Sequence, residues 1–289
     1  MRHIFRIIRG VTRTNVVYCW FASVYASIAT ITASVLGKPS FIVVGGVDVA
    51  KEEELGYGLW ISPWKSFLSR MAIKRAHRVL VVDESLREEV ASRVRYAGTN
   101  IEVLPTGFDS QFWTPLGTKE TSVLTVAAVT TEGRFKIKGL DILFDVARSL
   151  PDLRFTVVGV DQVLSTMFVP PGNVFVVPAV SQIDLLRYYQ RAKVYCQPSR
   201  REGLSNTLCE AMLCGCIPVA TDVGGSTRAI GENGIVVRTG DLSGLASGIR
   251  RALGMPDRVG DAARERIASL FPKQRREERL KELLNELGR

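Results

Sequence analysis

The chain has 289 residues, of which 46% are hydrophobic and 23% charged, and its formal net charge is +9. This composition favours a globular protein, and the length favours two α/β domains of roughly 110 to 160 residues each over a single domain. The excess of Lys and Arg favours anionic partners such as nucleotides or membrane headgroups, whereas the absence of a basic stripe interleaved with aromatics argues against nucleic acid.

The first part of the chain opens with a basic helix and then alternates short apolar runs with helical stretches. Strands are expected at 15–19, 41–44, 79–82 and 101–104, with helices near 23–36, 63–77 and 85–96 between them. This alternation predicts a small parallel α/β domain over residues 1–116. Residues 104–115 (LPTGFDSQFWTP) contain two prolines and no helical period, so they are expected to form the crossover between domains.

An uncharged run at residues 16–36 follows the arginine-rich start and is long enough for a membrane span. It is rich in Ser, Thr, Ala and Tyr, and it divides into the strand at 15–19 and the helix at 23–36. A buried strand–helix unit is therefore favoured over a membrane span or an interfacial helix.

A second series of strands and helices begins at residue 123. Strands are expected at 123–129, 154–160, 174–177, 193–198, 217–220 and 234–237, with helices at 140–149, 182–191 and 242–253. The pattern predicts a doubly wound sheet over residues 117–272. The tail at 262–287 is expected to be helical, with an apolar stripe of Leu280, Leu283, Leu284 and Leu287, and residues 273–289 are expected to pack back toward the first domain.

Two glutamates mark the segment from 199 to 215, SRREGLSNTLCEAMLCG. Glu202 is expected on the loop that leaves a strand at its carboxyl end, and Glu210 in the first turn of the next helix. Carboxylates there accept hydrogen bonds from sugar hydroxyls, and the backbone N–H groups of a helix start suit a phosphate. Each glutamate also has a simpler structural interpretation: Thr207 and Glu210 fit a T-x-x-E capping box, and Glu202 fits a solvated charge.

A basic loop is expected at residues 130–139, after the first strand of the second domain. Arg134, Lys136 and Lys138 would stand there just before a helix, where guanidinium and ammonium groups together hold a diphosphate. An ordinary basic surface turn is the alternative.

The cysteines and histidines argue against disulfides and metals. Five cysteines, an odd number, favour reduced thiols in the cytoplasm, and two histidines make a zinc site unexpected. No D-x-D pair, Walker A loop or G-x-G-x-x-G run is present, so a metal-bound nucleotide is not expected.

Three stretches of the chain are similar to landmarks of one enzyme family. The run from 194 to 237, with two glutamates seven residues apart followed by GCIPVATDVGG, resembles the donor-binding region of retaining GT-B glycosyltransferases of glycosyltransferase family 4. The GRFKIKG stretch at 133–139 and the PTGFD stretch at 105–109 resemble other landmarks of the family, in the expected order. The resemblance covers roughly residues 15–289 and implies two Rossmann-like parallel-sheet domains with a cleft between them.

The resemblance also implies roles for individual residues. Arg134 and Lys138 would hold the donor diphosphate and stabilise the charge of the leaving group, Glu202 would contact the donor sugar, and Glu210 would accept from the ribose hydroxyls. The turn that leads into the next helix would also bind the donor, through backbone contacts to the sugar and phosphate. Its residues are Gly203, Leu204, Ser205, Asn206 and Thr207. No metal and no cofactor are expected; the donor is a nucleotide sugar such as a UDP- or GDP-sugar.

The chain departs from this family in its first domain. The family usually has a His-Gly pair after the strand at 41–44, whereas this chain has Gly45, Gly46, Val47 and Asp48; the glycines and Asp48 are expected to line the same place, with Asp48 binding a hydroxyl. The chain also begins inside the family's acceptor domain, without its glycine-rich first loop, so either a truncated form or a reduced N-terminal domain is expected.

The expected function is a retaining, metal-independent hexosyl transfer from a nucleotide sugar to a lipid-linked, glycan or protein acceptor. The basic start, together with Trp60, Trp64 and Phe67, which are expected at the surface, favours a cytoplasmic protein with peripheral membrane contact. The alternative is a nucleotide-sugar-binding protein that is not catalytic or that depends on a partner to complete its acceptor domain. The sequence does not predict the oligomeric state.

Overall fold

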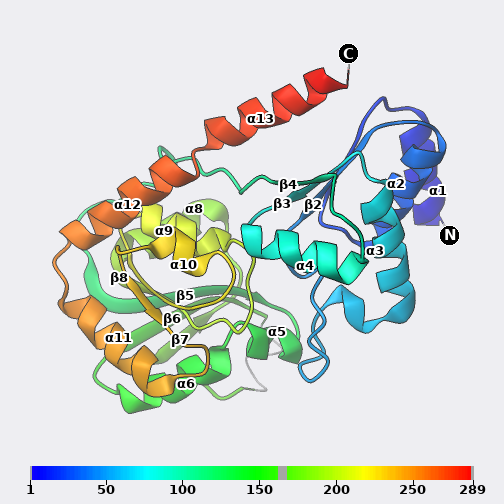
Figure 1. Ribbon diagram of the computed structural model, residues 1–289. Coiled ribbons are helices and arrows are strands. Elements are labelled where there is room, and N and C mark those ends of the chain that lie inside the picture. The colour runs from blue at the N-terminus through cyan, green and yellow to red at the C-terminus, as the bar shows by residue number, and fades with distance from the viewer. Residues whose placement is uncertain (1, 162–167, 288–289) are drawn as a thin grey trace. The chain divides into compact units, whose positions relative to one another are not determined.

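The computed structural model describes residues 2–161 and 168–287. The chain divides into two compact units, each with a parallel sheet (Figure 1). The first unit consists of Met1–Pro105 and Glu278–Arg289, and the second consists of Thr106–Glu277.

The first unit has a four-stranded parallel sheet in the order β1-β2-β3-β4. Its strands are β1 (Val17–Trp20), β2 (Ser40–Val44), β3 (Arg78–Val81) and β4 (Ile101–Val103). Consecutive strands are joined by α2 (Val24–Val35), α3 (Pro63–Arg75) and α4 (Glu84–Val94), with the short 3-10 helix η1 (Leu59–Ile61) before α3. The opening helix α1 (Arg2–Thr12) packs on α2. The strand β2 is buried along its whole length, as expected for an apolar run in a parallel sheet.

The uncharged run at 16–36 forms the strand β1 and the helix α2, as the sequence predicts. Ser23 begins α2 as its N-cap, accepting a hydrogen bond from the backbone N–H of Ala26. Over the residues that the structure describes, no helix combines the length and the apolar character needed to span a bilayer.

The second unit has a six-stranded parallel sheet in the order β10-β9-β8-β5-β6-β7. Its strands are β5 (Glu120–Val129), β6 (Arg154–Val160), β7 (Val174–Val177), β8 (Ala192–Gln197), β9 (Ile217–Thr221) and β10 (Ile235–Val237). The chain builds outward from β5 in one direction as far as β7 and then returns to β8 on the other side of β5. The order therefore reverses between β5 and β8, which is where doubly wound sheets bind their ligands.

Helices cover both faces of this sheet. The helices α6 (Leu140–Ser149) and α11 (Leu242–Gly254) contact each other on one face, while α9 (Asn206–Leu213) and α12 (Arg258–Leu270) pack together on the other (Figure 1). Two further helices of the unit are α8 (Gln182–Arg191), which packs beside α9, and the short α10 (Ser226–Ile230), which packs beside α12. The core between α6, α11 and the sheet is aliphatic and aromatic, and it includes Cys196. Cys209, Cys214 and Cys216 are also buried.

Two stretches differ from the prediction. Residues expected to form a basic loop contain the short helix α5 (Glu132–Ile137), which begins at the N-cap Thr131 and is followed by Gly139 in the left-handed region at φ 67°. The predicted single tail helix is interrupted between α12 and α13 (Lys273–Glu286), because Pro272 has no N–H to continue a helix. Of the predicted leucine stripe on α13, Leu283 is buried whereas Leu284 is 49% exposed.

Candidate functional site

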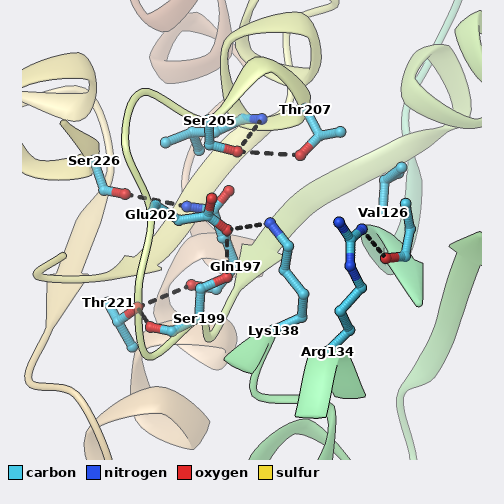
Figure 2. Close-up of polar contacts among 12 residues, drawn as sticks. Val126, Arg134, Lys138, Gln197, Ser199, Glu202, Ser205, Thr207, Thr221 and Ser226 are labelled. Carbon is cyan, nitrogen blue, oxygen red and sulfur yellow. Dashed lines mark hydrogen bonds and ion pairs between the residues drawn. The ribbon is translucent and has the colours of Figure 1, made fainter. Parts of the chain in front are cut away.

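The candidate site lies at the carboxyl ends of β5 and β8, the two strands between which the sheet order reverses. The chain leaving β5 forms α5, and the chain leaving β8 forms the loop at 198–205 that leads into α9. Figure 2 shows Lys138, from the end of α5, extending toward Glu202 of that loop. The sequence placed both residues at strand ends of one sheet, and the structure brings them together.

Glu202 and Lys138 form a short ion pair. The Lys138 Nζ lies 2.6 Å from Glu202 Oε1, and Ser199 Oγ donates to the same carboxylate oxygen at 2.8 Å. The Glu202 side chain is only 11% exposed and that of Lys138 is 25% exposed. Glu202 is therefore not the solvated surface charge of the simpler interpretation, but a positioned carboxylate that shares a partly buried site with an ammonium group.

The Glu202 loop is held from both sides by contacts that the sequence did not reveal. The Arg200 guanidinium pairs with both oxygens of Asp141 at 2.7 and 2.8 Å, and the Arg200 N–H donates to Ile137 O at 2.7 Å. On the other side, a Cβ built on Gly224 would lie 2.3 Å from the carbonyl oxygen of Glu202. Only a glycine allows this approach, so Gly224 and Arg200 position the loop that carries Glu202.

Arg134 stands one helical turn before Lys138, so their side chains leave the same side of the segment (Figure 2). One guanidinium nitrogen of Arg134 donates to the carbonyl of Ala128 at 3.1 Å, at the end of β5. Lys136 is different, because its ammonium group pairs with Glu132 at 2.8 Å on the exposed side of α5. The structure thus separates Lys136 from the other two cations of the predicted basic loop.

The alternative interpretation of Thr207 and Glu210 as a capping box is wrong. The N-cap of α9 is Ser205, whose hydroxyl accepts from the N–H of Leu208 at 3.4 Å. The Thr207 hydroxyl is inside the helix and accepts from Tyr195 Oη at 2.7 Å instead. The other predicted donor-binding positions lie in the turn that leads into α9, with Gly203 and Leu204 buried and Asn206 exposed.

Glu210 lies in the second turn of α9 rather than in the first, and its carboxylate is largely buried. Tyr189 Oη donates to Glu210 Oε2 at 3.1 Å. Burial raises the pKa of Glu210 to about 7, against the opposing effect of the Tyr189 hydrogen bond. Glu210 does not cap α9, so helix capping does not explain this buried carboxyl group. A buried acid with a raised pKa is typical of functional sites.

The remaining predicted residues, Gly45, Gly46 and Asp48, belong to the first unit. The Asp48 carboxylate is 2% exposed and accepts backbone N–H bonds from Ala22 at 2.9 Å and from Gly46 at 2.8 Å. Burial raises the pKa of Asp48, and these bonds oppose the rise. A Cβ on Gly45 would lie 2.5 Å from the Phe21 ring. In this structure Asp48 therefore ties together the ends of β1 and β2.

Among the described positions, no three or more His, Cys, Asp or Glu side chains lie together in a group that could hold a metal ion. Lys138 and Arg134 bring positive charge to the carboxyl end of β5.

The second unit matches a known family model, described as "Glycosyl transferases group 1", over residues 122–255. Among curated proteins, the D-inositol 3-phosphate glycosyltransferase of Mycobacterium sp. (strain KMS) is 27% identical over 210 residues, which cover 64% of this chain and 46% of the relative. The alpha-maltose-1-phosphate synthase of Mycobacterium tuberculosis (strain ATCC 25618 / H37Rv) is 26% identical over 258 residues, covering 76% of this chain and 65% of the relative. The chain thus spans between about half and two thirds of the length of these relatives.

Solved structures extend the likeness to nearly the whole chain. HepE of Anabaena in complex with UDP-glucose superposes with a TM-score of 0.81 at 14% identity, covering 98% of this chain and 82% of that one. Sucrose-phosphate synthase of Thermosynechococcus elongatus gives a TM-score of 0.79 at 18% identity, covering 98% and 76%. At such low identities the likeness shows the fold, which is the α/β fold of GT-B glycosyltransferases with two parallel sheets, as the sequence predicts.

Proposed function

We propose that this chain is a retaining glycosyltransferase that uses a nucleotide-diphosphate sugar as donor. The observation that carries the proposal is the group formed by Lys138, Arg134 and Glu202 at the point where the sheet order reverses. Two cations suit a diphosphate, and a carboxylate beside them suits sugar hydroxyls. The match of residues 122–255 to the group 1 glycosyltransferase model supports the same function.

In the proposed complex the diphosphate lies against Lys138 and Arg134. The ammonium group of Lys138 has three N–H donors, so it can bind a phosphate oxygen while it keeps the 2.6 Å contact with Glu202. These charges are fixed before the reaction, and they stabilise the negative charge that develops on the departing diphosphate. Glu202 accepts hydrogen bonds from the donor sugar, and Glu210 accepts from the ribose hydroxyls.

Retention of configuration follows if the acceptor hydroxyl attacks the face that the diphosphate leaves. The bond between the anomeric carbon and the diphosphate oxygen breaks, the bond between that carbon and the acceptor oxygen forms, and the hydroxyl proton passes to the departing diphosphate oxygen. Glu202 would orient the sugar, and no nucleophile from the protein is needed.

The donor is proposed to be a UDP- or GDP-sugar, and UDP is the first choice because HepE, a structural neighbour, binds UDP-glucose. The transfer is proposed to proceed without a metal, because Lys138 and Arg134 supply the positive charge at the diphosphate. No cofactor other than the donor is proposed.

The proposed acceptor is a hydroxyl group of a lipid-linked compound, a glycan or a protein. The matched relatives include an enzyme named for an inositol phosphate and one named for the synthesis of a maltose phosphate, so their acceptor chemistry varies. The acceptor therefore has to be found by screening.

A donor panel with two lysine variants tests this proposal. Full-length protein is incubated with UDP-, GDP- and ADP-sugars, and nucleotide release and calorimetric binding are measured. Lys138→Ala is expected to lower turnover on the order of 100-fold or more by removing a charge at the diphosphate. Lys136→Ala is the matched control, since this lysine lies two residues away but pairs with Glu132, and it is expected to retain turnover within about twofold.

Binding without turnover distinguishes the second candidate, a nucleotide-sugar-binding protein that is inactive alone. Its support is the departure of the first unit from the family pattern: the His-Gly pair is missing, and the Asp48 carboxylate accepts hydrogen bonds from the backbone N–H groups of Ala22 and Gly46. If a donor binds and no acceptor yields product until a second protein is added, this candidate replaces the first. If no nucleotide sugar binds at all, both are wrong.

Peripheral membrane contact at the cytoplasmic face is also proposed, from the helix α1. Two apolar residues of this helix are exposed to solvent, Phe5 to 70% and Ile4 to 42%. Arg6 and Arg9 of the same helix are exposed as well. Vesicles containing anionic phosphatidylserine are expected to sediment the protein, and Phe5→Ser is expected to reduce the sedimented fraction. Equal sedimentation with neutral vesicles would contradict an electrostatic contribution.

A further inference from the structure

A pocket lies wholly within the first unit, and none of the candidate-site residues lines it. Its lining residues come from the first half of α3, the second half of α4 and the loop that precedes η1, and its volume is about 710 Å³. That volume is in the range of small-molecule sites, which is roughly 300 to 1,000 Å³. The cationic side chains that line it are Lys51, Arg70, Arg93 and Arg95.

The charges in this pocket do not balance. Its two carboxylates are already paired, since Glu53 lies 2.8 Å from Lys51 and Glu89 lies 3.6 Å from Arg93. Within 2–161 and 168–287, no carboxylate lies at ion-pair distance from Arg70 or Arg95. The pocket therefore carries two guanidinium groups without a counter-charge.

Arg70 is held in place by contacts that leave part of its hydrogen-bonding capacity unused. Its guanidinium lies 5.5 Å from the centre of the Trp60 ring, and one terminal nitrogen donates to the carbonyl of Arg93 at 3.3 Å. The Arg70 Nε is buried and has no hydrogen-bond partner among the residues that the structure describes. The hydrogen bond to the end of α4 satisfies one nitrogen of this guanidinium group, but it leaves the buried Nε without an acceptor among the described residues.

The wall of the pocket is also fixed. The Trp60 indole is 6% exposed and donates to the carbonyl of Asp48 at 2.9 Å, so the ring that stacks on Arg70 cannot rotate away without breaking that bond. Ile61 and Pro63 add apolar surface, and Ser66 and Ser92 add hydroxyl groups. The pocket thus combines two unbalanced cations with a rigid, mixed lining.

We propose that this pocket binds a phosphomonoester of a small polar molecule such as a sugar. A phosphomonoester carries a charge of about −1.5 to −2 at neutral pH, which matches the two guanidinium groups that have no counter-charge. Guanidinium groups bind phosphate oxygens with two parallel hydrogen bonds. The volume exceeds that of a bare phosphate, so the lining is available to the organic part of the ligand. The site is independent of the proposed sugar transfer.

Calorimetric titration of the full-length protein with glucose 6-phosphate tests the proposal, with glucose as the uncharged comparison. Glucose 6-phosphate is expected to bind and to weaken as salt is raised, and glucose is expected not to bind in the same range. Arg95→Gln is the primary variant, because Arg95 is exposed and its replacement does not endanger folding. A loss of about tenfold or more in affinity is expected, as for removal of a charged hydrogen bond.

Two control variants show whether the phosphate compound binds in this pocket or elsewhere on the protein. Arg87→Gln removes the same charge from α4, the helix that ends just before Arg95. Arg87 is 51% exposed, pairs with Glu84 and does not line the pocket, so affinity is expected to be unchanged. Lys138→Ala is also expected to keep the affinity, since Lys138 belongs to the second unit. The proposal is overturned if glucose 6-phosphate does not bind at millimolar concentration, or if Arg95→Gln binds within about twofold of the unaltered chain.

Discussion

Replacement of Glu210 by Gln is expected to stabilise the protein at alkaline pH and to remove a pH dependence. Glu210 is buried in α9, and its pKa is raised from 4.5 to about 7. The folded protein therefore keeps a proton on this carboxyl in a range where the unfolded chain has lost it. The stabilisation from the neutral carboxyl is fully present below about pH 4.5, is lost as the pH rises toward about 7, and changes no further above it.

The size of the effect follows from the rise in pKa. At about 1.4 kcal/mol for each pKa unit, the rise from 4.5 to about 7 corresponds to about 3 kcal/mol in the free energy of unfolding. A Gln side chain has nearly the same shape and cannot ionise. The variant is therefore expected to match the unaltered protein near pH 4.5 and to exceed its stability by up to about 3 kcal/mol near pH 8.

Urea denaturation of both proteins across this pH range measures the difference, with tryptophan fluorescence as the signal. UDP-glucose binding provides a second readout, because its diphosphate does not titrate in this range. Ribose hydroxyls are donors to an ionised Glu210, so affinity is expected to rise as the pH approaches about 7 and then to level off. In Glu210→Gln the affinity is expected to be lower and independent of this titration. A stability difference that stays constant from acid to alkaline pH would refute the reasoning.

Three further predictions concern the site and its supports. Arg134→Ala is expected to lower nucleotide release on the order of 100-fold while changing the free energy of unfolding by less than about 1 kcal/mol, since the hydrogen bond that its side chain loses is the contact with the carbonyl of Ala128 at the end of β5. Gly224→Ala is expected to lower the free energy of unfolding, measured in urea, by about 2 to 3 kcal/mol, because the new Cβ would meet the Glu202 carbonyl. Gly240→Ala is the control: Gly240 also has a positive φ but open space around it, so a loss of about 1 kcal/mol is expected. Asp48→Asn is expected to lose about 1 to 3 kcal/mol, because an amide N–H₂ replaces an oxygen that accepts from the backbone; an unchanged urea midpoint would contradict that.

Hydrophobic pattern alone predicts most of the second unit. The bounds expected for β6, β7, α6 and α8 agree with the structure, because buried parallel strands are short apolar runs and these two helices repeat their apolar residues at helical spacing. The six residues of α5 are too few to show such a period, and its Lys and Arg residues made it look like a loop. Its start signal is the hydroxyl of Thr131, which accepts from the N–H of Arg134.

The site could be predicted in its parts but not in its connections. Parallel strands align their carboxyl ends, so the sequence could predict that Lys138 and Glu202 share one edge of the sheet. It could not choose between Ser205 and Thr207 as the N-cap of α9, because the choice depends on Tyr195, which occupies the Thr207 hydroxyl from another strand. Nor could the sequence predict the hydrogen bond from Tyr189 to Glu210, because it joins side chains 21 positions apart in the chain.

The buried thiols of the second unit give this chain an internal reporter of its own opening. Three thiols are fully buried on or beside β8, α9 and β9: those of Cys196, Cys209 and Cys216. Burial also raises the pKa of each thiol. In the folded state an alkylating reagent therefore cannot reach these thiols, and they are not ionised to the reactive thiolate. Each labelling event therefore requires a transient opening of an element next to Glu202 or Glu210. The rate of alkylation, followed by mass spectrometry of individual cysteines, measures how often the site-bearing segments separate. A nucleotide that binds the folded protein and not the opened form is expected to slow alkylation, and more so the tighter it binds. The native cysteines serve as the reporter, so no engineered cysteine or fluorophore is needed.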